Sequence, residues 1–185
     1  MKLLAFYGAV ALFFSTSSML AQGDSVSDKQ QKMNPKESIL ENTTASGNHN
    51  MLVSAVKMAD LESILDSEGP FTVFAPSDKA FGKLSKEDVT TLLNPKNKKN
   101  LHSLVTYHIV AGNLTASKML QAMCRGNGKA SFTTVQGDKI VAKMNGLDIV
   151  LEDKFGNKAT IVTADANQSN GIIHVVDSVI LPKEI

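Results

Sequence analysis

The hydrophobic positions in the first half of the chain repeat with the period of an α-helix. Between residues 48 and 69 they recur at intervals of three and four, the spacing of one helical face. These positions are Leu52, Ala55, Val56, Ala59, Leu61, Ile64 and Leu65. We expect a break near Asp60, and Gly69-Pro70 ends the pattern. The segment therefore predicts an amphipathic helix in two pieces.

Further helix signals surround this segment. Pro35 suits the first position of a short helix, and Ser77 and Thr115 are good N-caps. Ser85 and Asp88 have the spacing of a capping box, although Asp is not its preferred partner. The expected helices cover residues 35–43, 78–81, 84–94, 98–106 and 116–123.

Strand signals dominate the second half. Phe71–Ala75 and residues 107–112 read as short strands, and residues 159–166 and 170–182 as two later ones. The strongest signal is a hairpin over residues 139–152 with a two-residue Asn145-Gly146 turn. Its predicted pairs are Met144–Leu147, Ala142–Ile149 and Ile140–Leu151 on one face, and Lys143–Asp148, Val141–Val150 and Lys139–Glu152 on the other.

The order of these elements predicts the fold class. Helices in the first half and strands in the second favour an α+β domain with a mainly antiparallel sheet, not alternating βαβ units. A chain of 185 residues suits one such domain.

The last strand carries two polar residues in an apolar run, "NGIIHVVDSVILP". Such a strand is covered on both faces, and alternation puts His174 and Asp177 on opposite faces. They therefore cannot form a simple catalytic pair. A buried histidine needs hydrogen-bond partners, and we expect Thr72, Asn170 or Ser178 to supply them. The prediction is that Thr72, His174 and Asp177 are structural polar residues.

The N-terminus predicts export. Lys2, an uncharged apolar run and the segment "STSSMLA" are typical of a secretory signal peptide over residues 1–21, cleaved after Ala21. The alternative is a retained membrane anchor. Residues 22–34 are polar and read as a flexible linker. The folded domain is then expected over residues 35–185, in a secreted or periplasmic protein with no stable membrane insertion after cleavage.

Charge and cysteine content exclude several classes of function. The signal peptide holds one of the 19 Lys and Arg residues and none of the 18 Asp and Glu residues, so the mature chain is neutral. It has no long-range attraction to nucleic acid or to an anionic membrane. With Cys124 as its one cysteine, the chain forms no internal disulfide. Its stability is expected to come from packing alone.

No catalytic or metal-binding pattern assembles in the sequence. The four histidines are scattered, without the close spacing of a zinc helix. The stretch from Asp165 begins like a calcium loop but has Asn170 and Val176 where glycine and an acid are needed, so we read it as a polar turn between strands. No Gly-x-Ser-x-Gly nucleophile elbow occurs. We expect no catalytic residue, no metal and no cofactor.

Three stretches together resemble the motifs of the fasciclin domain family. They are "FTVFAPSDKAF", "LVTYHIVAGNLT" and "SNGIIHVVDSVILP", in the family's order and spacing. The resemblance runs from about Pro35 to Ile185 and is greatest to single-domain secreted bacterial members. It implies a compact β-wedge with helices packed on it, an extracellular or periplasmic location, roles in adhesion or surface interaction, and no common catalytic activity.

The resemblance also directs attention to the tyrosine–histidine motif, here Tyr107 and His108. In some animal members this motif has been tied to integrin binding, which we do not carry over because the chain has no Arg-Gly-Asp triplet. As candidate binding residues we take Tyr107, His108, Asn113 and Leu114, where strand gives way to loop and helix. Tyr107 and His108 are equally compatible with the core.

Three functions remain open from the sequence. The first is an exported, non-enzymatic module that binds a surface protein, a glycan or a matrix component. The second is a small-ligand-binding protein with a pocket between sheet and helices. The third is an enzyme of unrecognised type. A deep pocket with convergent polar groups would favour the second or third, and a shallow surface the first.

Overall fold

A computed structural model describes residues 33–92 and 94–182. The predicted signal peptide (1–21) and nearly all of the predicted linker (22–34) lie outside the described residues. Met33 and Asn34 are described, and the Asn34 N–H donates to Asn42 Oδ1 at 2.7 Å. The end of the predicted linker therefore already contacts the first helix.

Helices occupy most of the first half and strands most of the second, as predicted. The helices are α1 (Ile39–Ala45), α2 (Asn50–Met58), α3 (Glu62–Leu65), α4 (Asp78–Phe81), α5 (Lys86–Leu92), the 3₁₀ turn η1 (Pro95–Asn97), α6 (Lys98–Tyr107) and α7 (Ala116–Arg125). The strands are β1 (Phe71–Pro76), β2 (Ile109–Ala111), β3 (Lys129–Thr133), β4 (Lys139–Asn145), β5 (Asp148–Glu152), β6 (Lys158–Gln168) and β7 (Gly171–Val176).

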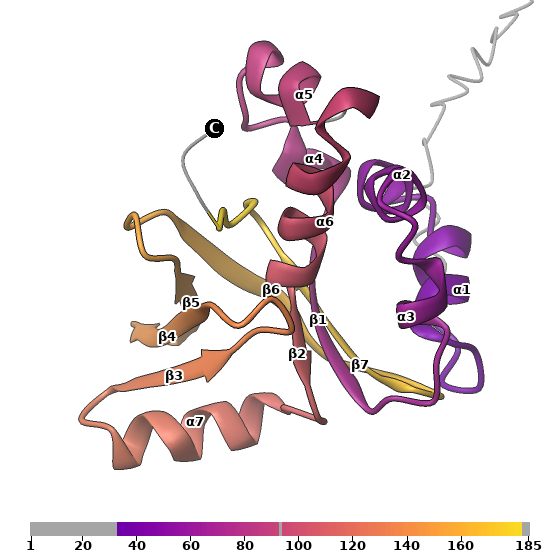
Figure 1. Cartoon of the computed structure of the whole chain (residues 1–185). Helices are drawn as coiled ribbons and strands as arrows, with labels where there is room; N and C mark the ends of the chain where they lie inside the picture. The colour runs from indigo at the N-terminus through magenta and orange to yellow at the C-terminus, as the bar shows by residue number, and fades with distance from the viewer. Residues whose placement is uncertain (1–32, 93, 183–185) are drawn as a thin grey trace, which may run out of the picture.

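The strands form one sheet that almost closes on itself. Its order is β2-β1-β7-β6-β5-β4-β3, and every pair is antiparallel except β1–β7. The two edge strands approach each other through a bridge between Val110 and Thr134, and the Val135 N–H donates to the Ile109 carbonyl at 2.8 Å. The sheet is thus a wedge, with α1–α6 along one side and α7 beside β3 (Figure 1). The prediction of an α+β wedge is confirmed.

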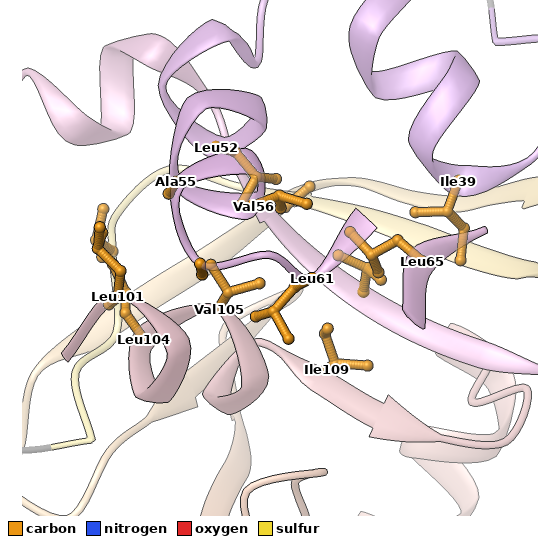
Figure 2. Packing of buried hydrophobic residues seen from close by; sticks show 14 of the residues in the cluster. Ile39, Leu52, Ala55, Val56, Leu61, Leu65, Leu101, Leu104, Val105 and Ile109 are labelled. Atoms are coloured by element: carbon orange, nitrogen blue, oxygen red, sulfur yellow. The ribbon is translucent and has the colours of Figure 1, made fainter. Parts of the chain in front are cut away.

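Two hydrophobic clusters fill this wedge. The larger lies between the sheet and the first helices, and Figure 2 shows members of it from α1, α2, α3 and α6 together with Ile109 of β2. The smaller lies between the sheet and α7, and includes Phe74, Tyr107 and Met119. The helical periodicity read from the sequence is confirmed, because Leu52, Ala55 and Val56 are all buried.

Local signals at the helix ends give a mixed outcome. The break at Asp60 is confirmed, since this residue has a φ of 53° between α2 and α3. Pro35 is not the first residue of a helix: Ser38 is the N-cap of α1, and with Glu41 it forms a complete capping box. The Ser38 side chain accepts the Glu41 N–H, and the Glu41 side chain accepts the Ser38 N–H, so the helix begins after Ser38 and not at Pro35.

The caps predicted for the next helices are present. Ser77 Oγ accepts the Ala80 N–H at 3.2 Å, and Thr115 caps α7 through Lys118. Ser85 Oγ accepts the Asp88 N–H at 3.0 Å and donates to Asp88 Oδ2 at 2.7 Å. Asp88 thus binds the Ser85 hydroxyl and does not complete a capping box.

The prediction of a strand over residues 107–112 is wrong in its first part. Tyr107 is still in α6, His108 is the C-cap, and only Ile109–Ala111 form β2. His108 Nδ1 donates to the carbonyl oxygen of Leu104 at 2.8 Å. This carbonyl is one of those that a helix end leaves free, so the histidine side chain extends the helix where the sequence suggested a strand.

The hairpin of β4 and β5 forms, but its predicted pairs are wrong. The register is Asn145–Asp148, Met144–Ile149, Lys143–Val150, Ala142–Leu151 and Val141–Glu152. The turn is Gly146-Leu147, and Gly146 has a φ of 64°. A glycine at the first central position suits a type II′ turn, which replaced the expected Asn-Gly type I′ turn. Lys143 now pairs diagonally with Glu152, with Nζ 2.6 Å from Oε1.

Candidate functional site

Buried polar side chains of the two end motifs bind the backbone of the central motif. Thr72 Oγ1 donates to the Gly112 carbonyl at 2.6 Å and accepts the Leu114 N–H at 2.8 Å. His174 Nε2 contacts the Leu114 carbonyl oxygen at 2.8 Å, so this nitrogen is the donor. Thr72 and His174 lie on the neighbouring parallel strands β1 and β7. Together they fix the segment that leads from β2 into α7.

The ring of His174 is buried, and both of its nitrogens are used. Nδ1 accepts the Asp165 N–H at 3.2 Å, and the ring stacks on Phe74 with centroids 5.7 Å apart. Burial lowers the pKa of His174, opposed by the hydrogen bond to Leu114 and by Asp165. The partners expected from the sequence, Thr72, Asn170 and Ser178, are wrong: His174 binds backbone groups that no spacing rule brings near it.

Asp177 faces away from this histidine and serves a different strand. Its Oδ1 accepts the Thr160 N–H at 2.7 Å, and its Oδ2 lies 2.9 Å from Lys83 Nζ. Burial acts to raise the pKa of Asp177, but the hydrogen bond from Thr160 and the Lys83 ammonium hold it below its usual value. His174 and Asp177 therefore form no catalytic pair, as their alternation along the strand predicts.

Tyr107 and His108 both lie in the core. The Tyr107 side chain is fully buried, and its hydroxyl donates to the Lys139 carbonyl at 3.1 Å. Burial, followed by the charges of Asp153 and Asp138, raises the pKa of Tyr107 to about 12. Burial lowers the pKa of His108 to about 4, against the hydrogen bond to Leu104. Both side chains are therefore uncharged at neutral pH.

The four candidate binding residues do not form one surface. Asn113 is exposed, whereas Leu114 is half-buried and packs against the smaller core cluster. Because Tyr107 and His108 are buried, only the loop at Asn113 and Leu114 reaches the surface in this conformation.

Two further buried polar residues hold the fold, and the sequence analysis missed their roles. Asn170 accepts the Ile39 N–H at 2.9 Å and donates to the carbonyls of Leu65 and Ser67. It thereby joins α1, α3 and β7. Asp153 accepts four N–H groups, among them the backbone N–H of Leu181 at 3.0 Å. The "KFGN" turn that follows Asp153 was the available signal, since such a turn often begins with an aspartate.

β6 is longer than predicted and bulged. The prediction of a polar turn from Asp165 is wrong: β6 continues to Gln168, and the turn is Ser169-Asn170. The register to β7 shifts twice between Ile161 and Ala166, and Asp165 has a φ of 59°. Asp165 Oδ1 accepts the Ala116 N–H at 2.8 Å at the start of α7. The irregularity therefore presents Asp165 to both α7 and His174.

A groove of about 790 Å³ lies between β6, the end of β7 and the first helices. We call it the β6 groove. Its apolar side includes Val162, Ala164 and Val175, and Val162 is 58% exposed. Asn48, His49, Asp78 and Lys79 line it from the start of α2 and from α4, and Thr163 and Asn167 from β6. Its volume lies within the range of about 300–1,000 Å³ usual for small-molecule sites.

His49 is the buried polar residue of this groove. Its side chain is 2% exposed, and Nδ1 lies 3.0 Å from the Pro76 carbonyl oxygen. A carbonyl only accepts, so Nδ1 carries the hydrogen and Nε2 holds the lone pair in the neutral ring. Nε2 has no partner among the described residues. No buried side-chain nitrogen or oxygen there lacks a partner, so Nε2 keeps some exposure to solvent, and His49 is one of the residues that line the groove.

Within residues 33–92 and 94–182, no group of three or more His, Cys, Asp and Glu side chains could hold a metal ion. In the same part of the chain, no helix has the length and hydropathy needed to cross a membrane.

The chain is similar to known proteins over most of its length. The model of the fasciclin domain matches residues 47–182. Two proteins of Synechocystis sp. are similar: protein sll1483 is 41% identical over 75% of this chain and 71% of its own length, and sll1735 is 38% identical over 77% and 96%.

A solved structure shares the fold. It is the fasciclin domain pair of the insect cell adhesion molecule fasciclin I, with a TM-score of 0.68 and 19% identity over 78% of this chain and 51% of that one. Together with the match of the family model over residues 47–182, the sequence, fold and motifs show that the chain belongs to the fasciclin domain family.

Proposed function

We propose that the protein is an exported, non-enzymatic interaction module that mediates contact at the cell surface or with a matrix. Its partner in this proposal is a surface protein, a glycan or a matrix component. The proposed organisation is a signal peptide over residues 1–21, a linker over 22–34 and a fasciclin domain over 35–185. A secreted or periplasmic location follows from that signal peptide.

The observation that supports a binding role best is the use of the motif polar residues. Thr72 and His174 are bound to the backbone of the loop at Leu114, and Asp177 to the backbone of β6. Thr72 and His174 thereby position a surface loop on the sheet, and binding residues are commonly held in this way on a rigid scaffold. The relationship to fasciclin I, a cell adhesion molecule, points the same way.

A cell- and matrix-attachment assay with the purified protein tests this function. The sharpest variant is Asn113→Arg, because Asn113 is exposed at the loop. Its matched control is Asn145→Arg on the distant β4–β5 hairpin, also an exposed asparagine. Leu114→Asp is unsuitable, since Leu114 packs on the core and its change would mix folding with binding. We expect attachment by the wild type and by the control, and a loss with Asn113→Arg.

Two results would contradict the proposal. Absence of attachment by the wild-type protein would contradict the contact function itself. Equal attachment by Asn113→Arg and Asn145→Arg would contradict the placement of the contact surface at this loop.

The β6 groove favours a second candidate function, the binding of a small ligand. It lies between sheet and helices, has an apolar side and is lined by several polar side chains. These are the properties of small-molecule sites. Titration with candidate ligands distinguishes this function from surface attachment.

A further inference from the structure

We propose that the β6 groove binds a neutral saccharide, with His49 Nε2 accepting a hydrogen bond from a sugar hydroxyl. This inference rests on the second candidate function above and names its class of ligand. The residues that carry it come from the start of α2 and from β6. Val175 in this groove lies on the opposite face of β7 from His174, which holds the loop at Leu114.

The first argument is the fixed acceptor at His49. The Pro76 carbonyl holds the hydrogen on Nδ1, so the lone pair is on Nε2, the accessible nitrogen of a ring that lines the groove. A buried ring does not turn freely to serve a ligand that offers only acceptors. The ligand must therefore bring an N–H or O–H donor to this point, and a sugar hydroxyl is such a donor.

The second argument is the remaining hydrogen-bonding capacity. The side chains of Asn48, Thr163 and Asn167 line the groove and make no hydrogen bond to another described residue. Each of the three both donates and accepts. Hydroxyl groups on neighbouring sugar carbons also donate and accept hydrogen bonds. They therefore match the two amides and the hydroxyl of these side chains, and no charged group is needed.

The third argument is that the charges of the groove are poorly suited to an ion. Asp78 already accepts the Met51 N–H and the Asn50 side-chain amide, each at 2.8 Å. Asp165 Oδ1 already accepts the Ala116 N–H. That bond directs the Asp165 carboxylate to α7, so the charged groups that the groove offers a ligand are Asp78 and Lys79 of α4. An anion or a cation would each meet one group of like charge there, and both carboxylate oxygens of Asp78 are already occupied.

The fourth argument is the apolar side of the groove. Val162, Ala164 and Val175 present small aliphatic side chains there, and Val162 is one of the most exposed large hydrophobic residues of the described chain. A sugar ring has C–H groups on its faces as well as hydroxyls at its rim. Burial of the C–H groups against these side chains would remove apolar surface from water.

Titration with defined sugars tests the proposal. The probes are maltotriose, mannotriose and N-acetylchitotriose, with sialyllactose as the anionic comparator. We expect saturable binding of at least one neutral probe with a Kd of about 1 mM or tighter, and weaker binding of sialyllactose. In ¹⁵N-correlated NMR spectra, the shifts should concentrate on residues 48–49 and 162–167. No binding of any neutral probe up to about 10 mM, or shifts confined to other residues, would overturn the proposal.

Matched variants give the test its control. Ala164→Trp should abolish binding by filling the groove, whereas Ala111→Trp, at an exposed alanine of β2, should not. His49→Asn keeps an N–H donor near the position of Nδ1 and removes the Nε2 acceptor, so it should weaken binding about three- to tenfold. Thr163→Val removes a hydroxyl that would make a second hydrogen bond to the sugar, and because Thr163 is exposed the change should leave folding intact. Unchanged binding by Ala164→Trp would also overturn the proposal.

The attachment assay, run on the same variants, separates this proposal from the contact function. Attachment without saccharide binding would overturn the saccharide site and leave the contact function standing. Saccharide binding without attachment would contradict the contact function and support the groove.

Discussion

His174 holds the carbonyl oxygen of Leu114, a residue 60 positions earlier in the chain, through a 2.8 Å hydrogen bond from Nε2. The N–H of the same leucine donates to Thr72 Oγ1 at 2.8 Å. Both backbone polar groups of Leu114 are therefore satisfied by buried side chains from β1 and β7. This arrangement ties the start of α7 to the centre of the sheet, and it predicts how the fold responds to substitution.

We expect His174→Ala to lower the free energy of unfolding by ~1–3 kcal/mol, because it leaves the Leu114 carbonyl and the Asp165 N–H without their partner. His174→Gln should cost less, since its amide can reach the position of Nε2. His102→Ala, at an exposed histidine, is the control and should have little effect. Urea melts measure all three. An unchanged midpoint for His174→Ala, with loss of ligand binding, would show that His174 belongs to a binding site.

Thr72 and His174 should be energetically coupled, since they hold the two ends of one residue. Thr72→Val keeps the shape of the side chain and removes the hydroxyl that binds Gly112 and Leu114. Once either change has released this loop, the other has less to disrupt. The loss in free energy of unfolding for the double variant should therefore be smaller than the sum of the two single losses, by at least about 0.5 kcal/mol. A double-mutant cycle by urea denaturation measures the coupling, and strict additivity would contradict a shared role.

Gly171 should be far more sensitive to substitution than another glycine of the domain. A Cβ at Gly171 would overlap the carbonyl oxygen of Phe71, its neighbour across the parallel β1–β7 pair. Close approach of two backbones is a usual reason for glycine inside a strand. We expect Gly171→Ala to destabilise the fold by more than ~2 kcal/mol.

Gly82→Ala is the control for this prediction. Gly82 follows α4 with a right-handed φ of −63°, and its nearest contact would be the Lys79 carbonyl at 3.3 Å. Its thermal midpoint should change little. Equal losses for the two variants would show that β1 and β7 can separate to admit a side chain.

Short-range features of the fold could be predicted from the sequence because the residues that decide them are neighbours. Ser77 and Thr115 cap their helices without any contact from a distant element, since each side chain accepts the backbone N–H three positions ahead. The hairpin register could not be predicted in this way. Moving the turn from Asn145-Gly146 to Gly146-Leu147 keeps every side chain on its face, so the hydrophobic pattern fits both registers.

The candidate sites depend on distant segments, which explains what the sequence could not predict. His174 finds Leu114 and Asp165 only after β7 has inserted between β1 and β6. The β6 groove joins residues of β6 and β7 with residues in or beside α1, α2 and α4, and no motif connects His49 with Thr163.

His108 should make the protein less stable in acid. Burial lowers the pKa of His108 from its usual 6.5 to about 4, so the unfolded chain binds this proton more readily than the folded one. The resulting stability is complete above about pH 6.5 and is lost as pH falls toward 4, by roughly 3 kcal/mol. Urea melts across this range should show a shallower loss for His108→Asn, which keeps a donor near Leu104 and cannot titrate. Carboxylates such as Asp177 titrate in both proteins, so the difference between the slopes isolates His108. If the variant does not fold, NMR titration of the wild-type imidazole decides the question, and protonation near pH 6.5 in the folded protein would contradict the prediction.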